Sequence, residues 1–107
     1  MIPDRWQIVL VQTEDSKIYK VFGTWGGSYL HGQSWRMNSG IVKVTEDDKC
    51  YYFHGYSGSV YECYKNSYGS FSYGDSILAQ MIDDFKPYGT ITVLPENTDW
   101  MKLEYEM

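Results

Sequence analysis

The chain has 107 residues and a mass of 12.5 kDa, so we expect a single domain over residues 1–107. Hydrophobic residues make up 43% and charged residues 21%, a balance that excludes a disordered chain, a collagen-like repeat and a coiled coil. The net charge of -5 disfavours a general nucleic-acid coat and a protein that binds anionic membranes. The 11 Tyr and 10 Gly favour strands and tight turns.

Strand patterns fill the first half of the chain. The apolar, mostly β-branched run within 6–12 predicts a buried strand, and 17–25 predicts its hairpin partner. The glycine-rich segment 26–40 predicts an ordered loop with room for one short strand. Further strands are predicted over 41–44 and 49–54, joined by an acidic turn.

The second half of the chain contains a helix between strands. A strand over 59–64 precedes a Gly, Ser and Tyr rich loop over 66–74. Apolar side chains at helical spacing predict a helix that Asp75 or Ser76 caps and that Pro87 ends. Strands are predicted over 90–94 and, from its alternating polarity, over 101–105 at a sheet edge. The helical apolar residues are Ile77, Leu78, Met81, Ile82 and Phe85.

This order of elements predicts an α+β fold. We expect a curved antiparallel sheet of about five to seven strands packed on one amphipathic helix, with a small, partly open barrel as the alternative. The start of the chain lacks the basic and then apolar pattern of an export signal, and no apolar run approaches the length of a membrane span. We therefore expect a cytoplasmic protein without a membrane partner.

The two cysteines are expected to be free thiols, as is usual in a reducing compartment. A four-residue hairpin loop over 55–58 would place Cys50 opposite Cys63, on one face, whereas a two-residue turn would place Cys63 opposite Tyr52. Cys50, His54 and Cys63, with the distant His31, lack the close cysteine pair of a zinc site. We expect no metal and no cofactor.

Basic residues are concentrated in one part of the chain. No acidic residue occurs from 16 to 45, although the chain as a whole is acidic. Two explanations of this uneven distribution stay open. The basic residues are separated from the acidic ones by chance on a solvated surface, or they form a local binding site for an anion. The basic residues of this segment are Lys17, Lys20, Arg36 and Lys43.

The same segment carries the candidate ligand-binding residues. Aromatic rings stack on bases, a guanidinium pairs with phosphate, and amide and hydroxyl groups orient a ligand. The alternative is a structural loop in which Trp35 is a buried anchor and Arg36 bonds carbonyls. The candidates are Trp25, Tyr29 and Trp35 for stacking, Arg36 and Lys43 for neutralising charge, and Asn38 and Ser39 for hydrogen bonds.

No pattern in the chain predicts an enzyme. The segment 55–59 lacks the glycine two residues after the serine and the following helix that a nucleophile elbow needs. The glycines at 23–27 do not follow the spacing of a nucleotide-binding loop. We therefore expect a non-enzymatic protein.

Two stretches carry a resemblance, namely Trp35-Arg36-Met37-Asn38-Ser39-Gly40-Ile41 and Gly55-Tyr56-Ser57-Gly58-Ser59-Val60-Tyr61. Both resemble patterns in small, mostly uncharacterised accessory proteins of tailed phages and related mobile elements. The resemblance covers about a third of the chain and transfers no site residue. It implies a protein that counters host defence in the host cytoplasm, either by sequestering a nucleotide signal or by gripping a defence protein.

Two functions from different classes follow. The first is a binding protein that sequesters a small anionic, nucleotide-like signal at the candidate residues above. The alternative is an inhibitor, similar to anti-CRISPR proteins, whose acidic surface mimics nucleic acid and binds a host defence protein. Direct nucleic-acid binding is not expected, and self-association through 101–105 into a homo-oligomer stays open. The acidic residues of the alternative are Glu46, Asp47, Asp48, Glu96, Asp99, Glu104 and Glu106.

Overall fold

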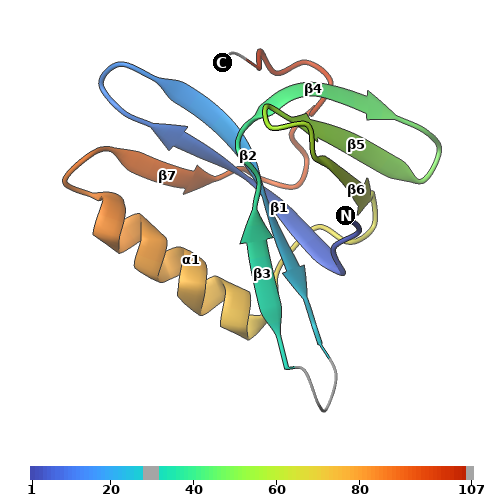
Figure 1. The fold of residues 1–107 in the computed structure, drawn as a ribbon, viewed down its shortest axis with the longest axis horizontal. Helices are drawn as coiled ribbons and strands as arrows, with labels where there is room; N and C mark the ends of the chain where they lie inside the picture. Colours follow the sequence, from blue (N-terminus) through green and yellow to red (C-terminus); the bar gives the residue numbers. More distant parts are fainter. Residues whose placement is uncertain (28–31, 106–107) are drawn as a thin grey trace.

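The computed structural model describes residues 1–27 and 32–105, in which strands and one helix form the α+β fold that the sequence predicts (Figure 1). No helix in these two ranges is long and apolar enough to cross a membrane. The elements are β1 (Arg5–Gln12), β2 (Lys17–Trp25), β3 (Ser34–Met37), β4 (Ile41–Glu46), β5 (Cys50–Gly55), β6 (Val60–Tyr64), α1 (Ser72–Phe85) and β7 (Thr90–Val93).

The strands are divided between two antiparallel sheets. Sheet A has the order β3-β2-β1-β7, and sheet B has the order β4-β5-β6. Neither sheet closes on itself, so the barrel alternative is not formed. The predicted hairpin of β1 and β2 is confirmed, with Arg5 opposite Thr24 and Gln12 opposite Lys17.

Sheet A lies between two hydrophobic cores because successive side chains of a strand point to opposite faces. Ile8 of β1 packs into the core that sheet A shares with sheet B, whereas its neighbour Val9 packs into the core under α1. Figure 1 shows α1 along sheet A on the side away from sheet B. The first core contains Trp6, Ile8, Tyr19, Val21, Ile41, Phe53, Tyr61, Cys63 and Trp100, and the second contains Val9, Phe22 and Leu78.

The helix starts earlier than the sequence predicts. It begins at Ser72, within the predicted loop, and its N-cap residue Phe71 makes no side-chain cap bond, so the predicted cap by Asp75 or Ser76 is wrong. Close packing on sheet A accounts for the difference. A β-carbon at Gly74 would lie 2.5 Å from Cγ2 of Thr24, so the glycine allows the first turn to approach the sheet.

The strand predicted over 101–105 is absent from the structure. The chain turns here instead, with the backbone amide of Met101 donating to Oδ1 of Asp99 at 3.1 Å. The Tyr105 hydroxyl donates to the carbonyl of Trp100 at 2.6 Å, and its ring contacts Tyr19 edge-on. The alternating polarity of this segment thus reflects packing of a turn against the first core.

The hairpin of β5 and β6 has neither of the two predicted registers. Its loop is Tyr56-Ser57-Gly58, with Gly58 at φ 95° and the Gly55 amide donating to the Ser59 carbonyl at 2.8 Å. Cys63 therefore lies opposite Tyr51, and Cys50 lies opposite Tyr64, on the other face. Both thiols are free and buried, and burial raises the pKa of each.

Candidate functional site

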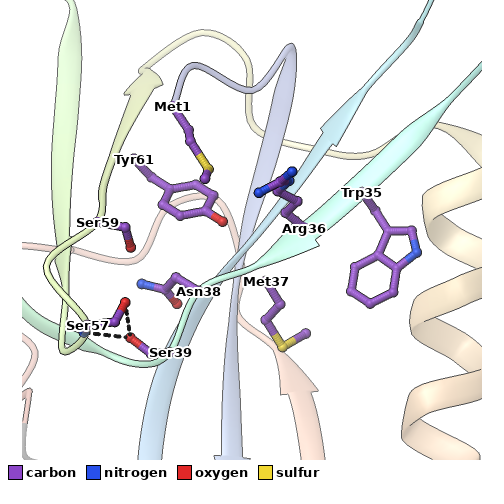
Figure 2. A pocket seen from close by; sticks show the side chains of 9 residues that line it. All are labelled: Met1, Trp35, Arg36, Met37, Asn38, Ser39, Ser57, Ser59 and Tyr61. Atoms are coloured by element: carbon purple, nitrogen blue, oxygen red, sulfur yellow. Dashed lines mark hydrogen bonds between the residues drawn. The ribbon is translucent and has the colours of Figure 1, made fainter. Parts of the chain in front are cut away.

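A pocket of about 420 Å³ lies where the end of β3 and the β3–β4 turn meet the β5–β6 hairpin (Figure 2). We call it the Asn38 pocket. Four of the seven predicted site residues line it, and the other lining residues come from the N-terminal segment, β3, the β5–β6 loop and β6. The lining residues are Met1, Trp35, Arg36, Met37, Asn38, Ser39, Ser57, Ser59 and Tyr61.

Pairing of β4 with β5 brings the two sides of the pocket together. Ile41 lies opposite Gly55, and the amide of Tyr56 donates to the carbonyl of Gly40 at 2.8 Å. The Ser57 amide donates to Oγ of Ser39 at 3.0 Å, and the Ser39 hydroxyl donates to Oγ of Ser57 at 3.2 Å (Figure 2). The turn after β3 and the hairpin tip are therefore one hydrogen-bonded unit.

Asn38 lies at the floor of the pocket with only 5% of its surface exposed. Its backbone amide donates to the carbonyl of Val21 at 3.1 Å, and its Oδ1 accepts from the Val21 amide at 2.9 Å. The second bond fixes which way the side-chain amide faces, because only the oxygen can accept. The Nδ2 nitrogen therefore faces away from β2, and it has no hydrogen-bond partner among the described residues.

Arg36 supplies the side-chain positive charge of the pocket. On β3 it alternates with Trp35 and Met37, so it points to the face of sheet A opposite α1, toward Tyr61 of sheet B, as Figure 2 shows. Arg36 is exposed and forms no ion pair within 1–27 and 32–105. Burial raises the pKa of the Tyr61 phenol, partly opposed by the Arg36 charge, so the phenol stays protonated near neutral pH.

Trp25 and Trp35, two of the three aromatic residues predicted to stack on a ligand, have rings that pack within the protein. The ring of Trp35 points toward α1 and stacks on Phe22 at 5.7 Å between ring centroids (Figure 2). The indole nitrogen of Trp25 donates to the carbonyl of Ile2 at 3.0 Å, and its ring packs against the first core. Tyr29 lies outside the described residues. The packing of the Trp35 ring agrees better with the alternative in which Trp35 anchors a structural loop.

The basic residues of the segment 16–45 do not gather at the pocket. Lys43 is exposed on β4 opposite His54 and is not among the lining residues, contrary to the prediction. Lys17 lies at the far end of β2 from Gly23, the partner of Arg36. Six residues of strand separate these two positions by about 20 Å. The basic residues that are close in the sequence therefore do not form one positive patch at the pocket.

Besides Met1 and Met37, the sequence prediction missed three lining residues with polar side chains, Ser57, Ser59 and Tyr61. These three polar residues belong to the second stretch of the resemblance, 55–61, and the structure brings that stretch against the first, 35–41. Their place at the pocket depends on the loop length of the β5–β6 hairpin. The one sequence signal that pointed to these residues was the resemblance itself, because its second stretch, 55–61, contains them.

The described residues contain no group of three or more His, Cys, Asp and Glu side chains arranged to hold a metal ion. Cys50 and Cys63 lie on opposite faces of sheet B, and His31 lies outside the described residues. The zinc arrangement considered from the sequence therefore does not form from Cys50, His54 and Cys63.

Comparisons with known protein families, curated proteins and solved structures gave no match. The site is accordingly interpreted from its own chemistry. It combines an exposed guanidinium, an unpaired amide nitrogen and several hydroxyl groups, and its lining residues include no Asp or Glu. Such a set of donors attracts an anion and hydrogen-bonds its oxygen atoms.

Proposed function

We propose that the protein is a non-enzymatic binding protein that sequesters a small anionic, nucleotide-like ligand through its phosphate in the Asn38 pocket. The observation that carries the proposal is the convergence of Arg36 with donor groups from the β3–β4 turn and the β5–β6 hairpin, in a pocket that no carboxylate lines. A charged hydrogen bond to a phosphate is stronger than a neutral one, and Arg is suited to it by its planar fork.

Binding accounts for this pocket better than catalysis does. To act as a nucleophile, a serine needs a neighbouring base to take its proton. The nine described residues that line the pocket include no Asp, Glu, His or Lys, and the pKa of Tyr61 is raised. The serine hydroxyls are therefore placed to donate hydrogen bonds to a ligand.

The phage setting enters the proposal through the sequence resemblance. The two stretches that resemble phage accessory proteins, 35–41 and 55–61, supply most of the lining residues. In that setting the protein would hold a phosphate-bearing immune signal in the host cytoplasm and keep it from its receptor. The aromatic contacts first assigned to Trp25 and Trp35 are not part of this proposal, because both rings pack within the protein.

The alternative function, an acidic inhibitor of a host defence protein, has less support. Glu46 forms an ion pair with Lys65 at 2.9 Å, and Asp99 lies 3.8 Å from Lys102. Asp47 accepts hydrogen bonds from two backbone amides and from the Tyr52 hydroxyl. These three carboxylates have local structural partners, and Glu106 lies outside the described residues.

The test is calorimetric titration of the protein with adenosine 5′-monophosphate. Replacing Arg36 by Ala should weaken binding by about ten- to a hundredfold, since a charged hydrogen bond is lost. Lys43→Ala is the matched control, because it removes one positive charge of the same sequence segment outside the pocket, and it should leave affinity within about twofold. Equal losses in both variants would refute the pocket, and a wild type that binds no anion would refute the function.

A further inference from the structure

Sheet B has one face in the first core and a second face on the outside of the molecule. Phe53 of β5 and its cross-strand partner Tyr61 of β6 point inward and are buried. Tyr52 and His54 flank Phe53 in β5, so they point outward, and both are half-buried. Directly opposed residues share a face, so the register fixes the other outward residues. We call the outward residues the outer face of sheet B, which comprises Tyr52 and His54 with Lys43 and Thr45 of β4 and Val60, Glu62 and Tyr64 of β6.

The centre of the outer face is partly apolar and held in place. Val60 is 37% exposed and Tyr64 is 40% exposed. Oγ1 of Thr45 lies 3.4 Å from Nε2 of His54, and the Tyr52 hydroxyl donates to a carboxylate of the β4–β5 turn at 2.6 Å. Tyrosine is enriched at protein interfaces because it buries a large ring at a small cost in conformational entropy. The composition of this face therefore suits contact with another protein surface.

The lysine and the glutamate of the outer face lie at its opposite edges. Lys43 is in β4, on one side of β5, and Glu62 is in β6, on the other side. Neither forms an ion pair within residues 1–27 and 32–105. Lys43 lies opposite His54 and Glu62 lies opposite Tyr52, so the strand spacing and the rise along β5 separate their Cα atoms by about 12 Å. The midpoint between the two charges falls on β5, between Tyr52 and His54.

This arrangement of charge is complementary to itself. A twofold axis between two such faces, above the midpoint and at right angles to the line from Lys43 to Glu62, places each lysine over the glutamate of the second copy. Both ion pairs form at once, and Tyr52 and His54 of the two copies meet in the centre. A partner surface of one sign would pair with one charge and repel the other, whereas a second copy pairs with both.

We infer that the protein forms a symmetric homodimer through the outer face of sheet B, in which Lys43 of each copy pairs with Glu62 of the other. Tyr61 lines the Asn38 pocket from the inner face of sheet B, so the inference does not depend on the proposed function. Three strands of five or six residues present an area near the lower limit of specific interfaces. We therefore expect a dissociation constant of about 10–100 µM.

Sedimentation velocity of the full chain, from about 5 to about 500 µM, brackets the dissociation constant expected for an interface of this size. Lys43→Glu and Glu62→Lys each place like charges opposite one another at both edges of the interface, and each should weaken the dimer by about tenfold or more. The double variant Lys43→Glu/Glu62→Lys exchanges the two signs. It should restore the wild-type dissociation constant within about threefold, because the two positions act as a pair.

The single variants also separate the local ion pair from the overall charge of the chain. Lys43→Glu makes the net charge of -5 more negative, whereas Glu62→Lys makes it less negative. If repulsion between two acidic chains set the association, Glu62→Lys would strengthen the dimer. Lys86→Glu is the matched control for Lys43→Glu, because it changes the net charge equally and lies at the end of α1, on the far side of sheet A (Figure 1). It should leave the dissociation constant within about twofold.

Three results would overturn the inference. The first is a wild type that stays monomeric at every concentration. The second is a dimer that tolerates both single reversals, because its contact would then lie elsewhere. The third is a double variant that associates as weakly as the single ones. If a reversal variant is unfolded by circular dichroism, Val60→Lys decides, because it adds an unpaired charge to the same face and should weaken the dimer by about tenfold.

Discussion

At the scale of single residues, Tyr68 links the connection before α1 to two neighbouring parts of sheet A, the middle of β1 and the end of β7. Its hydroxyl donates to the carbonyl of Leu94 and accepts from the amide of Ile8 at 3.3 Å. Its ring stacks on Trp100 at 5.6 Å and meets Trp6 edge-on at 4.8 Å between centroids. Burial raises the pKa of Tyr68 to about 12, so the hydroxyl keeps its proton as a donor.

Replacing Tyr68 by Phe is expected to destabilise the protein by about 1–3 kcal/mol, because the ring stays packed while buried backbone groups lose their partner. Urea unfolding followed by fluorescence measures the change. Tyr56→Phe is the control, since Tyr56 is 70% exposed and its change should stay within about 0.5 kcal/mol. Equal stability of Tyr68→Phe and the wild type would show that water replaces these bonds.

At the scale of elements, the β4–β5 turn depends on one carboxylate. Oδ1 of Asp47 accepts from the amides of Lys49 at 2.9 Å and Cys50 at 2.8 Å, and Oδ2 accepts from the Tyr52 hydroxyl at 2.6 Å. The bond from Tyr52, and then the two amide bonds, lower the pKa of Asp47 to about 2 from 3.8. This turn sets the pairing of β4 with β5, on which the pocket depends.

The lowered pKa of Asp47 predicts how stability changes in acid. Its contribution is fully present above about pH 3.8 and is lost as the pH falls through about 2, because the unfolded chain takes up the proton first. Asp47→Asn should therefore flatten the fall in melting temperature over this interval. Asp48→Asn, the neighbouring control, should leave the slope unchanged. A slope that is the same in Asp47→Asn and the wild type would contradict the role given to this carboxylate.

At the scale of the whole molecule, sheet A is shared by both hydrophobic cores. Every inward residue of β1 and β2 packs toward either α1 or sheet B, so loss of one core removes support from the other. The protein should therefore unfold as one cooperative unit, as expected for a single domain over 1–107.

Leu78→Ala tests this coupling, because Leu78 is the buried helix residue of the second core. The change should cost about 2–5 kcal/mol by leaving a cavity. Far-ultraviolet circular dichroism follows α1, and in a Trp35→Phe background the tryptophan fluorescence follows Trp6, Trp25 and Trp100, which pack in or against the first core. We expect coincident transitions at a lower denaturant concentration, whereas loss of the helical signal first would contradict one unit. Ala79→Gly, an exposed change on the same helix, is the control and should cost about 1 kcal/mol.

Much of this architecture could be predicted from local patterns. The helix was recognisable because Ile77, Leu78 and Met81 recur at helical spacing, and the β1–β2 hairpin because two β-rich runs flank a polar turn. The division into two sheets was not predictable. A run such as Ile8 to Val11 indicates burial on both faces of a strand but does not indicate what covers each face.

Only the part of the pocket that comes from one short segment of the chain could be predicted from the sequence. Arg36, Asn38 and Ser39 lie within four consecutive positions of the sequence, so their grouping needed no register. Ser57 joins them through pairing of β4 with β5, which local spacing does not fix. Trp35 was assigned to a ligand because an aromatic residue near glycines has the same local pattern whether its ring packs in a core or faces a ligand.

The position of β1 between the two cores makes it sensitive to chain length. Because side chains alternate between the cores, adding or deleting a single residue in β1 would send Ile8 toward α1 and Val9 toward sheet B. The three-residue tip of the β5–β6 hairpin is free of this constraint, because Tyr56 and Ser57 are exposed. Homologues that diverge in ligand are therefore expected to vary in length at this tip and to keep β1 at constant length.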